Sequence, residues 1–180
     1  MLFRSYELLE GSKTALRLNW SALIVFLLLL VAAWIVTDRL QMPIKHLAFT
    51  ADSLLFFGGY LASAALHEGL HGAFFKLFAP ERKLRSGIKN GFTHIISPGS
   101  RFSKSQFIWI AAAPFVLLTL LGAVIMVFTG VYFWLGLLLI THAASCVGDF
   151  YWIWRVGGAP KDVRVEATEQ GLALYLPQEK

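Results

Sequence analysis

Residues 61–78 read LASAALHEGLHGAFFKLF, and this stretch determines how the rest of the chain is interpreted. Two histidines and a glutamate, His67, Glu68 and His71, lie in the middle of an apolar run. Burying ionisable groups among apolar side chains is costly unless they are paired or bind a metal. Inside a membrane span such residues mark functional sites by default. The stretch therefore predicts a functional site on a buried or membrane-spanning helix.

The composition of the chain is that of a membrane protein. The chain has 180 residues, enough for one domain over residues 1–180, and 57% of them are hydrophobic. Its mean hydropathy of +0.62 is high for a soluble domain. Cys146 is the only cysteine, which excludes an intramolecular disulfide. The net charge of +5 does not predict nucleic-acid binding, because the basic residues are distributed along the chain as in the loops of a membrane protein.

Four apolar segments predict four transmembrane helices, because each is close to or above the roughly 20 residues that a span needs. The first resembles a signal peptide, but its length and the lack of a clear cleavage site favour a retained anchor. Thr129 and Gly130 form the expected turn between the last two spans, and Pro114 is expected to kink the third. The predicted spans are residues 19–37, 47–78, 106–128 and 131–154.

The distribution of Lys and Arg predicts the orientation of these spans. Basic residues are concentrated before span one, between spans two and three, and after span four. The loop between spans one and two has only Arg39 and Lys45, and the loop between spans three and four has none. The positive-inside rule then places both termini and the long middle loop in the cytoplasm. We therefore expect an integral membrane protein in the lipid bilayer of a cytoplasmic membrane.

Two segments outside the spans carry strand patterns. In the basic middle loop, GFTHIIS at residues 91–97 could form a short strand. In the C-terminal tail, apolar residues alternate on both sides of a turn at residues 169–171, which predicts a β-hairpin over residues 162–177. The expected fold class is an all-α membrane protein with four transmembrane helices, a short β segment in the cytosolic loop and a C-terminal β-hairpin.

The pattern His67-Glu68-Gly69-Leu70-His71 is H-E-x-x-H. On a helix, residues i and i+4 share one face, so both imidazoles can reach one metal ion. Zinc accepts imidazole nitrogen and lowers the pKa of a bound water toward about 7, and Glu68 can take the proton from that water. A chance match in a buried helix is the alternative, but the cost of burying Glu68 without a partner argues against it.

A catalytic zinc site needs a third protein ligand, which should lie in another span. Asp149 and His142 are the candidates, and Asp149 is the only acidic residue of the last two spans. Counted at about 1.5 Å per residue from the outer ends of their spans, Asp149 matches the depth of the histidine pair and His142 lies nearer the outer face. We therefore expect Asp149 to complete the site and His142 to be accessory. Asp52 is expected to mark the outer interface.

These residues resemble the site-2 protease group of intramembrane zinc metalloproteases. The resemblance is closest to a small bacterial family of zincin peptidases with the pattern His-x-x-x-Cys-x-Gly-Asp, which runs here from His142 to Asp149. It implies His67, His71 and Asp149 as zinc ligands and Glu68 as the catalytic base. The order Gly148-Asp149 departs from the Asp-Gly of the better-known site-2 proteases.

Two functions fit this pattern. The first is a zinc-dependent intramembrane metallopeptidase that hydrolyses a peptide bond of a membrane protein or peptide by attack of metal-bound hydroxide. The second is a non-catalytic, zinc-stabilised scaffold or chaperone for transmembrane segments. Glu68 favours the enzyme, because a purely structural zinc site has no use for an unliganded glutamate. A zinc transporter fits poorly, since spans one and three offer almost no polar path. No pattern predicts the oligomeric state.

Overall fold

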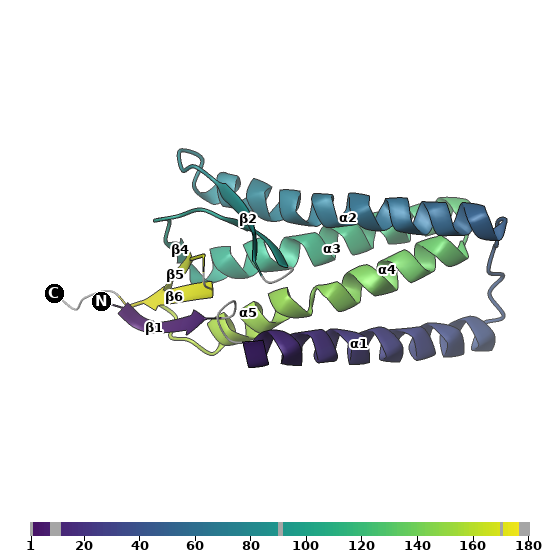
Figure 1. The fold of residues 1–180 in the computed structure, drawn as a ribbon, viewed down its shortest axis with the longest axis horizontal. Helices are drawn as coiled ribbons and strands as arrows, with labels where there is room; N and C mark the ends of the chain where they lie inside the picture. Colours follow the sequence, from purple (N-terminus) through teal and green to yellow (C-terminus); the bar gives the residue numbers. More distant parts are fainter. Residues whose placement is uncertain (1, 8–11, 90–91, 170, 177–180) are drawn as a thin grey trace. The chain divides into compact units, whose positions relative to one another are not determined.

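The fold is mostly helical and is described for residues 2–7, 12–89, 92–169 and 171–176 of a computed structural model (Figure 1). Its helices are α1 (Ser12–Arg39), α2 (Phe49–Phe78), α3 (Lys104–Thr129), α4 (Phe133–Ser145) and α5 (Val147–Gly157). Within these described residues, four helical segments are long and apolar enough to cross a membrane. They coincide with the four predicted spans, which confirms the helices themselves.

The fourth predicted span is present as one apolar segment, residues 133–157, but an irregularity at Cys146 divides it into two consecutive helices. Helix α4 ends at Ser145, α5 begins at Val147, and Cys146 between them has φ −72° and ψ 2°. The carbonyl of His142 accepts both the Ser145 hydroxyl at 2.7 Å and the Cys146 N–H at 3.2 Å. Hydrogen bonding of a serine side chain back to the preceding turn is known to bend helices. The break makes Asp149 a first-turn residue of α5, where a negative charge is favourable.

The chain divides into two compact units, and α1, α2 and α3 each contribute to both. The unit formed by residues 19–67 and 115–147 contains most of α1, the first part of α2, the second part of α3 and all of α4. Glycines let its helices approach closely: a Cβ at Gly122 would lie 2.4 Å from Leu139, and a Cβ at Gly59 would lie 2.9 Å from Leu138. Small residues have this role at helix interfaces in membranes. They bring α4 close to both α2 and α3.

The other unit, residues 1–18, 68–114 and 148–180, contains the strands and the main hydrophobic core. Its larger sheet has the strand order β1-β6-β5-β4 (Figure 1). Its strands are β1 (Leu2–Glu7), β4 (Phe102–Ser103), β5 (Arg164–Ala167) and β6 (Gly171–Tyr175). Strands β5 and β6 pair antiparallel, which confirms the predicted hairpin in the tail. The core of this unit is formed by side chains from helices and strands together, among them Phe75, Phe107, Ile110, Val156, Val165 and Leu174.

Strand β1 was not expected from the sequence. It pairs antiparallel with β6 from Leu2 opposite Tyr175 to Glu7 opposite Gly171. Its partner strand lies about 170 residues further along the chain, so no local sequence pattern predicts the pairing. The sheet thus joins the first and last described strands of the protein.

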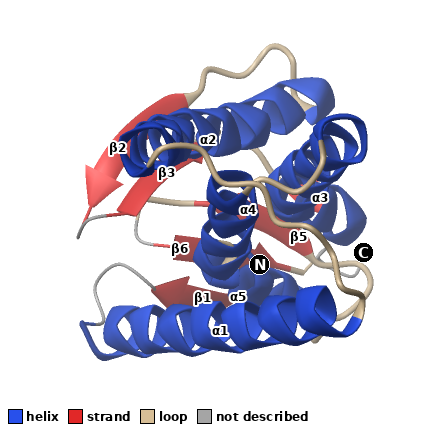
Figure 2. Ribbon diagram, turned by 90° about the vertical axis from the view of Figure 1, so that its right-hand side faces the viewer, coloured by secondary structure: helices blue, strands red, loops and turns tan. Residues whose placement is uncertain are grey.

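A second, two-stranded sheet pairs β2 (Arg85–Lys89) with β3 (Phe92–Ile96) in antiparallel register (Figure 2). Strand β3 confirms the short strand predicted at residues 91–97, of which Gly91 lies outside the described residues. A Cβ at Gly72 of α2 would lie 3.4 Å from Leu84 and 3.6 Å from Ile95. Helix α2 therefore contacts this hairpin one residue after His71. In the described part of the chain, β3 has a strand partner on one edge only.

Candidate metal centre

Helix α2 carries the H-E-x-x-H residues without interruption. It runs for 30 residues from Phe49 to Phe78, so His67 and His71 lie one turn apart on the same face. Glu68 is partly buried on the same helix, three residues before His71. Gly69 lies beside open space, since a Cβ there would meet nothing within 4 Å among the described residues outside its own helix backbone. Two residues after His67, Gly69 lies on the side of α2 away from the two histidines, whereas Gly72 is packed against the β2–β3 hairpin.

His71 is held between α3 and α5. Its Nδ1 lies 2.8 Å from the carbonyl oxygen of Ile110, and its Nε2 lies 3.3 Å from Oδ1 of Asp149. A carbonyl oxygen can only accept a hydrogen bond, so Nδ1 carries the proton. In a neutral imidazole Nε2 is then an acceptor, and it faces the carboxylate oxygen of Asp149, also an acceptor. Two acceptors at 3.3 Å need a proton or a metal ion between them.

The Ile110 carbonyl is available to His71 because of Pro114. In an α-helix the carbonyl of residue 110 would accept the N–H of residue 114, and α3 continues through both positions. Proline has no N–H, so this bond is missing. Both Ile110 and Pro114 are buried, so water cannot replace the missing N–H donor. The His71 ring supplies the donor instead, which fixes its tautomer and orients Nε2 toward Asp149.

His67 lies beside α4. Its Nδ1 is 3.3 Å from Nε2 of His142 and 3.9 Å from Sγ of Cys146. Cys146 Sγ is in turn 3.7 Å from His142 Nε2, and the two imidazole rings meet edge to face with centroids 5.5 Å apart. His142 and Cys146 are both buried. Three potential ligand atoms therefore converge at this point of the structure.

Within each compact unit the structure brings two of the predicted residues together. His71 and Asp149 form one pair, and His67 and His142 form the other, while α2 carries both histidines of the motif. His142 and Asp149 were expected on one face of a single helix, but they belong to α4 and α5. Sequence reasoning missed Cys146 as a neighbour of His67. The signal was present, because His142 and Cys146 have the same i, i+4 spacing as His67 and His71.

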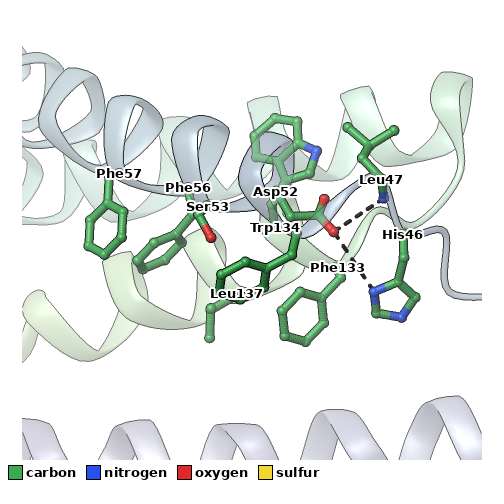
Figure 3. Close-up of a pocket in the computed structure, with 10 residues that line it drawn as sticks. His46, Leu47, Asp52, Ser53, Phe56, Phe57, Phe133, Trp134 and Leu137 are labelled. Carbon is green, nitrogen blue, oxygen red and sulfur yellow. Dashed lines mark hydrogen bonds and ion pairs between the residues drawn. The ribbon is translucent and has the colours of Figure 1, made fainter.

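A separate pocket of about 420 Å³ lies at the start of α2 and contains none of these residues (Figure 3). Its lining is mostly aromatic and apolar, with the carboxylate of Asp52 as its acidic group. Asp52 Oδ2 accepts the backbone N–H of Leu47 at 3.2 Å and lies 3.9 Å from Nδ1 of His46 (Figure 3). A side chain that reaches back to a backbone N–H before the helix acts as an N-terminal cap. Asp52 therefore stabilises the start of α2.

Comparison with known families shows which family the chain belongs to. Residues 60–164, more than half of the chain, match the model of the family DUF3267, which is described as "Putative zincin peptidase". The chain belongs to this zincin peptidase family. No curated protein and no solved structure matches the chain. Zincin peptidases depend on zinc, so zinc is the cofactor of the family.

The residues at His71 fit the zinc of a zincin peptidase. Zinc binds imidazole nitrogen and carboxylate oxygen at about 2.0–2.2 Å, so two such ligands of a tetrahedral ion lie about 3.4 Å apart. The separation of His71 Nε2 and Asp149 Oδ1 is 3.3 Å. The Nδ1–H bond to Ile110 is also the kind of outer hydrogen bond that zinc-binding histidines make. The donor types, their spacing and their support all suit zinc.

Proposed function

We propose that this member of the zincin peptidase family is a membrane-embedded zinc metallopeptidase that hydrolyses a peptide bond in or near the membrane, like the site-2 proteases. His67, His71 and Asp149 bind zinc, and Glu68 is the catalytic base. The observation that carries the proposal is the pair of acceptors, His71 Nε2 and Asp149 Oδ1, that face each other at 3.3 Å. The i, i+4 spacing on the unbroken α2 adds His67 as the remaining protein ligand.

Different residues of the chain have different roles in the proposed hydrolysis. Zinc, when bound, supplies a Lewis acid that acidifies water and polarises a substrate carbonyl. Glu68 accepts the proton of the attacking water and delivers it to the leaving amine as the peptide bond breaks. Ile110 and Asp149 keep the His71 ring oriented throughout.

The β2–β3 hairpin is proposed to hold the substrate in an extended form. A peptide bond inside a helix is hydrogen-bonded and sterically hidden, so the substrate must unwind before it is cleaved. An edge strand satisfies the backbone groups that unwinding exposes. Strand β3 is suited to this role, because Ile95 packs next to Gly72, one residue beyond His71.

The membrane setting of the proposal comes from the helices and the charges. Four apolar segments can span a bilayer, and the basic residues favour cytosolic termini and a cytosolic middle loop. The substrate is then a membrane protein or a membrane-bound peptide. Nucleic acid is not expected as a partner.

Glu68→Gln tests the proposal directly, because it removes the base and preserves the size of the side chain. The variant is expected to keep its zinc and to lose cleavage of single-span model substrates in detergent or proteoliposomes. Typical losses on removing a general base are about 10²–10⁴-fold. The matched control is Glu81→Gln, which changes an exposed glutamate after α2 in the same way. Full turnover by Glu68→Gln would refute Glu68 as the base, and loss of zinc would make Glu68 a ligand. Absence of cleavage by the zinc-loaded wild-type protein would leave a non-catalytic zinc scaffold as the better description.

A further inference from the structure

We infer that His67, His142 and Cys146 form a second metal position, distinct from the pair of His71 and Asp149, and that a metal ion there joins α2 to α4. The ion is of the zinc class: a d¹⁰ metal that accepts imidazole and thiolate together. This inference goes beyond the proposed peptidase function. It uses neither His71 nor Asp149.

The distances between the three ligand atoms carry the inference. Around a tetrahedral zinc ion, two nitrogens lie about 3.3 Å apart, and a nitrogen and a sulfur lie about 3.6 Å apart. The separation of His67 Nδ1 and His142 Nε2 is 3.3 Å. Those from Cys146 Sγ to the same two nitrogens are 3.9 and 3.7 Å. The triangle therefore has the size of one face of a zinc tetrahedron.

The surroundings also suit a structural metal. His142 is 4% exposed and Cys146 is 0% exposed, so two polar groups are placed in an apolar helix packing. Soft thiolate combined with imidazole selects zinc or copper(I) over hard ions such as magnesium. The ligands come from positions about 75 residues apart, on α2 and α4. A metal that closes so long a loop stabilises the folded chain by restricting the unfolded one.

His67 can serve both positions as an imidazolate, because loss of the remaining ring proton leaves a lone pair on each ring nitrogen. Its Nδ1 is directed at His142 and Cys146. Its Nε2 is the nitrogen that would bind the proposed catalytic zinc. The shared histidine couples the two positions. A metal bound to Nδ1 fixes the orientation of the His67 ring, and this orientation sets the direction in which Nε2 points.

Cobalt(II) distinguishes the two positions, because only one of them contains sulfur. Co²⁺ occupies tetrahedral zinc sites, and a thiolate ligand adds a charge-transfer band in the near ultraviolet. Cys146 is the only cysteine of the chain, so this band can come from no other residue. The full-length protein is purified in detergent, stripped with a chelator and titrated with Co²⁺. The background variant His71→Ala removes the catalytic pair, and Asp149→Asn is a second background in case the first fails to fold.

Both backgrounds are expected to bind one equivalent of Co²⁺ with the thiolate band. Adding Cys146→Ser to either background should abolish the band and weaken Co²⁺ binding at least tenfold. Thermal unfolding of the background variants should shift upward with Co²⁺, and the shift should vanish with Cys146→Ser. Co²⁺ binding without a thiolate band, or no Co²⁺ binding in folded backgrounds, would overturn the second position. Neither result affects the proposed peptidase, which depends on the Glu68→Gln comparison.

Discussion

Replacing Pro114 by alanine is expected to make the protein more stable and its catalytic metal site weaker. Pro114 has no N–H, and its helical acceptor, the Ile110 carbonyl, accepts His71 Nδ1 at 2.8 Å instead. Alanine at this position has an N–H that can return to the same carbonyl, within the helix. The His71 ring then competes for its hydrogen bond and is oriented less firmly toward Asp149.

The two effects have opposite signs and can be estimated separately. Proline costs about 3 kcal/mol relative to alanine in a helix interior, so the variant should be more stable by roughly 1–3 kcal/mol after local relaxation. A hydrogen bond such as that of His71 contributes a net free energy of about 1 kcal/mol to the stability of the fold. Loss of an outer-shell partner lowers metal affinity by about 10–100-fold. A higher melting temperature together with weaker zinc is a combination that nonspecific damage does not produce.

The assay combines thermal unfolding of the metal-free protein with zinc affinity measured by competition against a chelator. Thr119→Ala is the control, because it raises helix propensity in α3 without affecting the Ile110 carbonyl. The control should keep wild-type zinc affinity. Unchanged zinc affinity in Pro114→Ala would refute the reasoning that the missing N–H is what holds His71.

Three further changes test other parts of the structure. Asp149→Asn should weaken the zinc that supports cleavage by tenfold or more, because it removes the charge facing His71 Nε2; His142→Ala should leave that zinc in place and slow turnover. Both are measured as cleavage against free zinc, and the reverse pattern would contradict the ligand assignment. Ile95→Pro should impair cleavage and spare zinc content, and unchanged turnover would count against substrate pairing with β3. Gly122→Val should lower stability by about 1–3 kcal/mol, since its Cβ would lie 2.4 Å from Leu139, and an unchanged melting temperature would show that this helix contact can relax.

The helices were predictable because their signal is local. Each span is an apolar run of the length that a bilayer requires, and the helices that form follow those runs closely. The tail hairpin was equally local, with alternation on both sides of a turn. Strand β1 was not predictable, since its partner β6 lies at the other end of the chain. The break at Cys146 was also missed, because hydropathy has no term for a serine that bonds to the carbonyl three residues before it.

The candidate site shows the same division between local and distant information. The H-E-x-x-H spacing by itself predicts that His67 and His71 share one face of a helix, and α2 confirms this. The choice of Asp149 relied on counting depth along a continuous span, and the actual reason for its position is different. The chain breaks at Cys146 and restarts, so Asp149 enters at the first turn of a new helix. Asp149 therefore faces His71 as expected, but from the first turn of α5 rather than from the middle of a continuous helix.

The same spacing rule applies a second time in this chain. His142 and Cys146 repeat the i, i+4 arrangement of His67 and His71, although Cys146 is the C-terminal cap of α4. Both pairs lie among apolar residues, where polar side chains need partners. The first pair belongs to a known motif. The second pair is recognised as a possible metal site only from the structure, which places His142 Nε2 and Cys146 Sγ close to His67 Nδ1. Spacing shows which side chains of one helix act together, whereas only packing shows which helices they face. For this reason Cys146, to which the sequence analysis gave no role at the metal, becomes the residue whose substitution separates the two metal positions.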